Sequence, residues 1–289
     1  MKQPIFEGVA TAMVTPFKNG TIDASQWEIL LQRQIDAHVD AVVVCGTTGE
    51  AATMSDDEQL ALIAHTVRYV AGRCKVIAGT GSNDTSHCVQ LSRHAAQIGA
   101  DALLVVTPYY NKCTQNGLAA HFTAVADAVD IPVIVYNVPS RTGMDISVDT
   151  YRVLSEHPRI NGTKEAAGGV SKISRIRNAC GDDLCVWSGN DDEAVPMMSV
   201  GAKGLISVLS NLRPNETVRM IHACLDGDFA AASRLQTELM PLIDVLFCEV
   251  NPIPIKKALN LVGFDVGELR LPLTPLSEAN AERLKKCLS

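Results

Sequence analysis

The sequence contains no basic cluster, no long apolar run and no regular cysteine pattern, and each absence excludes a class of protein. Its nine cysteines are irregularly spaced, odd in number and without a CxxC pair, so neither a secreted disulfide framework nor a zinc site is expected. No uninterrupted apolar stretch is long enough to span a bilayer, and residues 1–8 carry charge and proline where a signal peptide needs an apolar run. These absences predict a soluble, cytoplasmic protein with no membrane partner.

Nucleotide and metal chemistry also lack support in the sequence. The net charge of −7, without local clusters of lysine and arginine, argues against a nucleic-acid partner. The glycine-rich string Gly79-Thr80-Gly81 fits neither the dinucleotide fingerprint nor the phosphate loop, and the seven histidines are scattered. We therefore expect no metal and no cofactor, and an anionic substrate would need locally placed cations.

Short runs rich in Val, Ile, Leu and Ala alternate with longer amphipathic stretches. Such runs are typical of buried parallel strands rather than of strands with one solvated face. We predict eight of them, near residues Gly8–Val14, Ala41–Cys45, Lys75–Ala78, Ala102–Val106, Pro132–Tyr136, Ile160–Thr163, Leu184–Trp187 and Gly204–Val208.

The amphipathic stretches carry helix boundaries. Ser55 with Glu58 three residues later forms a capping-box pattern, and Gly72 and Gly99 stand where two helices should end. Strict strand–helix alternation with eight strands favours a closed TIM (β/α)8 barrel, whereas a doubly wound open sheet uses the same local signals. The chain length fits one such barrel.

After the eighth strand the pattern becomes purely helical. Helices are expected at Asn215–Leu225, Phe229–Phe247, Pro252–Val262 and Ser277–Leu288. We predict a barrel domain over residues 1–224 and a helical C-terminal extension over 225–289. Because no low-complexity linker separates them, the extension should pack on the barrel.

Lys164 is the strongest candidate for chemistry. It directly follows the sixth predicted strand, and the residues after barrel strands form the active face of this fold. Burial penalises the ammonium form of lysine, and the neutral amine attacks carbonyl groups. The alternative is a surface lysine paired with Glu165.

Other polar residues follow strands in the same way. Tyr136 closes a strand and offers a phenol for proton transfer, although a packed aromatic is the simpler interpretation. Thr47 and Thr48 offer hydroxyls and turn amides for a carboxylate or a proton relay, and the alternative is an ordinary turn. Arg141 can grip a carboxylate with its guanidinium fork, unless it is merely solvated.

Three motifs in this order resemble those of the 4-hydroxy-tetrahydrodipicolinate synthases, also called dihydrodipicolinate synthases. They are Gly46-Thr47-Thr48-Gly49-Glu50, Tyr136-Asn137-Val138-Pro139-Ser140-Arg141-Thr142-Gly143 and Gly162-Thr163-Lys164-Glu165. The resemblance covers essentially the whole chain. It implies a lyase of lysine and diaminopimelate biosynthesis that condenses pyruvate with aspartate 4-semialdehyde through a Schiff base.

The resemblance also implies roles for individual residues. Lys164 would form the pyruvate imine, and Tyr136, Thr47 and Tyr110 would relay protons, with Tyr110 reaching a neighbouring subunit of a homotetramer built as a dimer of dimers. Substrate contacts would come from Thr48, for the pyruvate carboxylate, from Gly189 and Ile206, which shape the pocket, and from Arg141, for the carboxylate of the semialdehyde.

The same superfamily includes N-acetylneuraminate lyases and keto-sugar-acid aldolases, which share the lysine and the tyrosine. Thr48 and Arg141 favour the synthase, because the related lyases do not usually resemble it in the arginine. A non-catalytic barrel is the other class of alternative, and it predicts a broken relay. Lys164, Tyr136 and Thr47 are all present, however, as are Tyr110 and Arg141.

Many relatives bind lysine, the pathway's end product, at a subunit interface. Asn83 and Tyr109 match that site, whereas His87 stands where lysine-sensitive relatives carry glutamate, and Asp56 and Gln59 stand where bacterial relatives often carry histidine. A cationic ligand needs an anionic partner when it is desolvated, so we expect weak or absent inhibition by lysine. Asp56 compensates only if it faces the same pocket.

Overall fold

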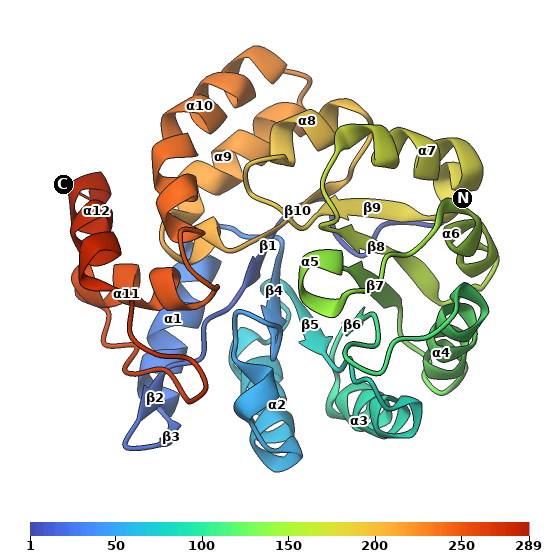
Figure 1. Ribbon diagram of the computed structural model, residues 1–289, viewed down its shortest axis with the longest axis horizontal. Helices are drawn as coiled ribbons and strands as arrows, with labels where there is room; N and C mark the ends of the chain where they lie inside the picture. Colours follow the sequence, from blue (N-terminus) through green and yellow to red (C-terminus); the bar gives the residue numbers. More distant parts are fainter. Residues whose placement is uncertain (289) are drawn as a thin grey trace.

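The computed structural model describes residues 1–288 and contains a closed barrel of eight parallel strands (Figure 1). Each strand pairs with its neighbours around the barrel in the order β1-β10-β9-β8-β7-β6-β5-β4, after which β4 pairs with β1. This confirms the predicted TIM barrel and rules out the open sheet. The strands are β1 (Gly8–Ala12), β4 (Ala41–Val44), β5 (Lys75–Gly79), β6 (Ala102–Val106), β7 (Val133–Asn137), β8 (Ile160–Glu165), β9 (Cys185–Ser188) and β10 (Gly204–Ser207).

A ring of helices surrounds the barrel (Figure 1). Its members are α1 (Ala24–Asp36), α2 (Asp56–Val70), α3 (Thr85–Ile98), α4 (Gln115–Asp127), α6 (Val148–Ser155), α7 (Val170–Cys180), α8 (Ala194–Ser199) and α9 (Pro214–Leu225). The single turn α5 (Pro139–Thr142) lies inside the ring, in front of the barrel in the view of Figure 1. Short 3-10 turns lie at η1 (Ala51–Thr53), η2 (Gly181–Asp183) and η3 (Leu209–Asn211).

The strands are buried on both faces, which explains their continuous apolar sequences. In β4, Ala41 and Val43 belong to the cluster inside the barrel, whereas Val42 and Val44 pack against the helices. Because side chains alternate along a strand, one apolar run supplies both the barrel interior and the helix-facing layer.

The helix boundaries follow local capping chemistry. Ser55 and Glu58 form the predicted capping box at the start of α2, and Gly99 ends α3 in the left-handed conformation, with a φ of 101°. At the end of α2 the left-handed cap is Ala71, with a φ of 47°, one residue before the predicted Gly72. Gly72 continues the turn with a positive φ of 78°.

Two local features differ from the sequence prediction. A two-stranded antiparallel hairpin, β2 (Phe17–Lys18) with β3 (Thr21–Ile22), follows the first barrel strand and was not predicted. Strand β8 continues through Glu165, so Lys164 lies within the barrel wall rather than after it. Backbone pairing of Lys164 with Tyr136 and Trp187 on the flanking strands maintains the extended conformation to that point.

The C-terminal extension comprises α10 (Phe229–Leu246), α11 (Ile253–Leu261) and α12 (Glu278–Leu288). Helix α10 packs on α8 and α9, and α11 packs on η3, which confirms that the extension docks on the barrel. Figure 1 shows these helices together at one side of the barrel. The boundary between residues 224 and 225 falls inside α9 and stays a prediction.

A buried ion pair fastens the extension to the barrel. Lys256 on α11 donates to Glu50 Oε1 at 2.8 Å, and both side chains are almost fully buried. The other oxygen of Glu50 accepts a hydrogen bond from the backbone N–H of Arg270, whose guanidinium forms a two-pronged contact with Glu58. Glu50 therefore joins the turn after β4 to two points of the extension.

Within residues 1–288 no helix is long and apolar enough to cross a membrane. In the same residues no group of three or more His, Cys, Asp or Glu side chains is placed to hold a metal ion.

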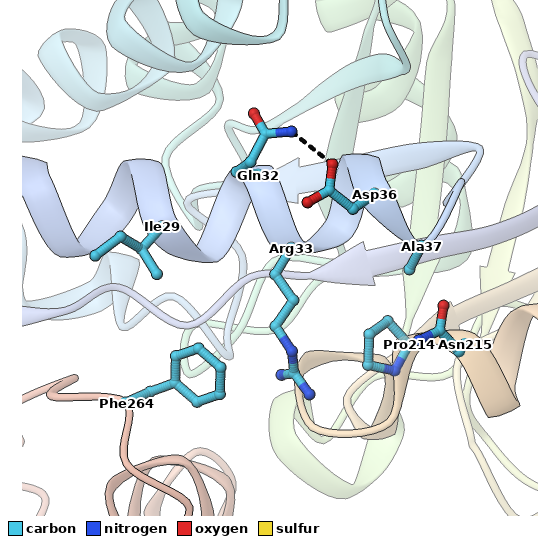
Figure 2. Close-up of a pocket in the computed structure, with 8 residues that line it drawn as sticks. All are labelled: Ile29, Gln32, Arg33, Asp36, Ala37, Pro214, Asn215 and Phe264. Atoms are coloured by element: carbon cyan, nitrogen blue, oxygen red, sulfur yellow. Dashed lines mark hydrogen bonds between the residues drawn. The ribbon is translucent and has the colours of Figure 1, made fainter.

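A surface cavity of about 470 Å³ lies between α1 and the start of α9 (Figure 2). Arg33 points into it across the ring of Phe264, but its guanidinium donates to the carbonyls of Asn211 and Leu212. This cation is thus already engaged, and the cavity lies in the helix layer rather than inside the barrel.

Candidate active site

Lys164 points into the barrel. It occupies the same level of the sheet as Tyr136 on the neighbouring strand, and its Nζ lies 4.3 Å from the centroid of the Tyr136 ring. Only 6% of the Lys164 surface is exposed. The lysine is therefore a buried interior residue with an aromatic face beside its amine.

Glu165 points the opposite way, into the layer between β8 and the helices. Its carboxylate accepts hydrogen bonds from Asn137 Nδ2, the Tyr151 hydroxyl and the backbone N–H of Ala167. Lys172 supplies the nearby cation at 3.5 Å. The alternative that Lys164 is a surface lysine paired with Glu165 is therefore wrong.

The surroundings of Lys164 favour its neutral form. Burial lowers the pKa of Lys164 to about 8, Asp191 acts in the opposite direction, and Arg141 lowers the pKa further. At neutral pH roughly one tenth of such an amine is uncharged, against about three in ten thousand for an unperturbed lysine. The site thus supplies a nucleophilic amine without a separate general base.

Asp191 is a charged neighbour of Lys164 to which the sequence prediction assigned no role. Its carboxylate accepts from the Ser207 hydroxyl at 2.5 Å and from the backbone N–H groups of Val208 and Leu209. Burial raises the pKa of Asp191, and the hydrogen bonds oppose that rise. The sequence did contain a signal for Asp191, because it lies just after the seventh predicted strand, in Ser188-Gly189-Asn190-Asp191.

Tyr136 is a buried phenol in the interior cluster of the barrel. Burial raises its pKa to about 12, with Arg141 acting against the rise and Glu165 adding to it. The hydroxyl therefore keeps its proton at neutral pH and can donate it to a reacting oxygen.

The adjacent threonines occupy different environments. Thr48 is buried, and its Oγ1 accepts a hydrogen bond from Asn251 Nδ2 at 3.0 Å. Thr47 is exposed, and its carbonyl accepts from the N–H of Glu50 in the turn. Within one chain, Thr48 is thus buried and held by Asn251, whereas the neighbouring Thr47 is exposed.

Arg141 lies on α5, the single helical turn that follows β7. Its guanidinium donates to the main-chain oxygen of Asn251 at 3.3 Å, and its charge acts on both Lys164 and Tyr136. The structure therefore gathers Lys164, Tyr136 and Arg141 in one region of the barrel.

Gly189 and Ile206 border the same space. A Cβ at Gly189 would stand 3.0 Å from Lys164 Cε and 2.7 Å from Ala166 Cβ, so a larger residue would displace the lysine. Ile206 is fully buried and belongs to the interior cluster that contains Tyr136.

Tyr110 is not brought into the barrel within one chain. Its side chain is 92% exposed, and its backbone is left-handed with a φ of 68°. An exposed aromatic on an unfavourable backbone is an unusual surface feature. Of the predicted catalytic residues, Tyr110 and Thr47 are thus the two that lie on the surface.

The residues predicted to bind lysine form their own contacts. His87 Nε2 lies 2.8 Å from Asp56 Oδ2, and its Nδ1 contacts Ser82 Oγ. Asn83 accepts from Asn111 Nδ2 through its main-chain oxygen, and Tyr109 is partly exposed. Gln59, by contrast, is buried and donates to the carbonyls of Ala51 and Met54. The Asp56 carboxylate thus already has a partner.

Comparison with known proteins assigns the chain to a family. The model of the Dihydrodipicolinate synthetase family matches residues 5–289. A 4-hydroxy-tetrahydrodipicolinate synthase of Caldicellulosiruptor saccharolyticus is 51% identical over 289 residues, covering 99% of this chain and 97% of that protein.

Solved structures agree with this assignment. The chloride-inhibited dihydrodipicolinate synthase of Acinetobacter baumannii, complexed with pyruvate, superposes with a TM-score of 0.96 at 42% identity, covering 98% of each chain. The enzyme of Cyanidioschyzon merolae with lysine bound gives a TM-score of 0.95 at 39% identity, covering 99% of this chain and 98% of that one. The chain therefore belongs to the dihydrodipicolinate synthase family.

Proposed function

We propose that this protein condenses pyruvate with aspartate 4-semialdehyde to give 4-hydroxy-tetrahydrodipicolinate, with Lys164 as the nucleophile. The observation that carries the proposal is the buried Lys164 amine over the Tyr136 ring, with its pKa near 8. The neutral amine attacks the ketone carbon of pyruvate, the resulting hydroxyl takes a proton from Tyr136 and leaves as water, and the protonated imine forms.

The remaining steps follow from that imine. The iminium nitrogen withdraws electrons, the pyruvate methyl loses a proton, and the enamine carbon attacks the aldehyde carbon of the second substrate. The amino group of that substrate then attacks the imine carbon, closes the ring and expels the Lys164 amine. Over the complete cycle the Lys164 amine is regenerated and the relay groups regain their protons.

Protons must move at the pyruvate oxygen that leaves as water, at the pyruvate methyl carbon and at the aldehyde oxygen. Tyr136 is the buried donor beside Lys164, Thr47 extends the relay to the exposed turn after β4, and Tyr110 of a second copy of the chain completes it. Thr48 and its backbone hold the pyruvate carboxylate between Gly189 and Ile206. Arg141, a fork-shaped cation, holds the carboxylate of the semialdehyde.

A keto-sugar-acid aldolase or an N-acetylneuraminate lyase is the competing activity, because the fold and the nucleophile are shared. The location of Arg141 beside Lys164 and Tyr136 favours the small anionic aldehyde. Comparing turnover with aspartate semialdehyde and with sugar acids tests the choice. Faster turnover of a sugar acid would refute it.

Arg141→Ala is expected to lower kcat/KM for aspartate semialdehyde about 10- to 100-fold, because a charge-assisted contact to its carboxylate is lost. Borohydride trapping of pyruvate on Lys164 should stay near the wild-type level. Arg234→Ala, an exposed arginine on α10, is the matched control and should change neither. An equal loss of trapping and turnover would assign Arg141 to pyruvate or to the fold.

We infer that a second copy of the chain covers the exposed Tyr110, in dimers that pair into tetramers. The phenol would then complete the partner's relay. Dilution that dissociates the assembly should lower the specific activity, and Tyr110→Phe should lower it in the intact assembly. A fully active monomer in ultracentrifugation would contradict this role.

We also infer a cytoplasmic location, because the proposed substrates are small and soluble.

Lysine is expected to inhibit weakly or not at all. Asp56 is engaged by His87, so the pocket offers no unpaired carboxylate among these residues for a second ammonium. A titration of the initial rate against lysine checks this, and strong inhibition at submillimolar lysine would disprove it. His87→Glu should strengthen lysine binding, because it supplies an anion and releases Asp56.

A further inference from the structure

Asn251 connects the two predicted carboxylate-binding residues. It lies just before α11 in the extension, where its Nδ2 donates to Thr48 Oγ1 at 3.0 Å and its main-chain oxygen accepts from Arg141 at 3.3 Å. Thr48 belongs to the turn after β4 and Arg141 to the turn after β7. One residue of the extension thus spans the interval between them.

The side-chain oxygen of Asn251 has no partner within residues 1–288, although the residue is only 7% exposed. A buried acceptor without a donor is unfavourable, so such a group is satisfied by an ordered water or by a bound ligand. The vacant acceptor lies beside two residues that hold substrate carboxylates. It therefore points to a substrate group that donates hydrogen bonds.

The two substrates differ in what they can donate. Pyruvate has no N–H or O–H group at neutral pH, whereas aspartate semialdehyde carries an ammonium group next to its carboxylate. An ammonium ion has three donors and no acceptor. When the substrate carboxylate binds Arg141, the ammonium group on the same carbon lies within reach of Asn251, which Arg141 also contacts.

We propose that Asn251 is a substrate-binding residue whose Oδ1 accepts a hydrogen bond from the amino group of the aldehyde substrate. This rests on the proposed function. Arg141 fixes the carboxylate, the enamine on Lys164 fixes the aldehyde carbon, and Asn251 fixes the amino group. Three contacts around one stereocentre distinguish its two configurations, so Asn251 sets the preference for one enantiomer.

The test compares kcat/KM for the two enantiomers of aspartate semialdehyde in the wild type and in Asn251→Leu. Both enantiomers contain the amine needed for ring closure, so the comparison measures only how the position of that amine affects kcat/KM. The ratio should fall about 10- to 100-fold in the variant, through loss of the preferred enantiomer. Asn251→Asp, which keeps an acceptor at this place, should retain most of the preference.

Two controls separate this proposal from others. At saturating pyruvate, borohydride trapping at Lys164 should persist in Asn251→Leu, although the lost contact with Thr48 raises the pyruvate concentration that trapping needs, and failure of trapping in the wild type would refute the proposed function instead. Asn161→Leu makes the same chemical change at an equally buried amide at the start of β8, where its Nδ2 donates to the main-chain oxygen of Gln3, and its ratio should equal the wild-type ratio. An equal loss for both enantiomers in Asn251→Leu, or no preference in the wild type, would overturn the role of Asn251.

Discussion

Lys164→Met is expected to lower turnover by at least about 10³-fold, because no other group in the site can form the imine that both later steps require. Methionine keeps the length and apolar stem of the side chain, so the barrel should fold as before. The steady-state rate of pyruvate consumption measures the loss, and circular dichroism checks the fold. Lys285→Met, an exposed lysine on α12, is the control and should remain fully active.

The pH dependence of imine formation provides a second view of the same residue. The attacking species is the neutral amine, and its fraction increases as the pH rises towards the Lys164 pKa of about 8. The rate of imine formation should therefore increase up to about pH 8 and then level off. A rate that keeps rising to pH 10 would indicate an unperturbed lysine.

Breaking the buried pair of Glu50 and Lys256 is the second change with a large expected effect. Lys256→Met leaves the Glu50 carboxylate buried without its cation, which should cost about 3–5 kcal/mol of unfolding free energy. Chemical denaturation of the purified variant measures this loss. Because Glu50 lies two residues after Thr48, activity should fall as the extension loosens.

The double variant Glu50→Gln with Lys256→Met is expected to recover part of the lost stability, because neither charge is then left unpaired. The exposed pair of Lys285 and Glu282 is the matched control, and Lys285→Met should leave the denaturation midpoint unchanged. A stability of Lys256→Met equal to the wild type would show that the pair does not fasten the extension.

The barrel could be predicted because its strands are locally distinctive. A run such as Ala102–Val106 is apolar at every position, which is the pattern of a strand that is covered on both faces. Its predicted bounds equal those of β6. The hairpin of β2 and β3 was missed because each strand has two residues, too few for any periodic pattern.

The candidate site was predictable only in part. Lys164 follows one predicted strand and Tyr136 closes the strand before it, so the topology alone brings them together. Asn251 contacts Thr48 across a sequence separation of 203 positions, and Lys256 contacts Glu50 across a separation of 206. No local sequence pattern predicts contacts at such separations, because they form only when the extension packs on the barrel. The identity of the buried partners therefore needed the structure.

Borohydride reduction in the presence of pyruvate, followed by peptide mapping, tests the central claim most directly. We expect one carboxyethyl group per chain on Lys164 and none on Lys256, the other deeply buried lysine, because the ammonium of Lys256 is held by Glu50. An adduct on any other lysine, or no adduct in a folded and active enzyme, would contradict the account.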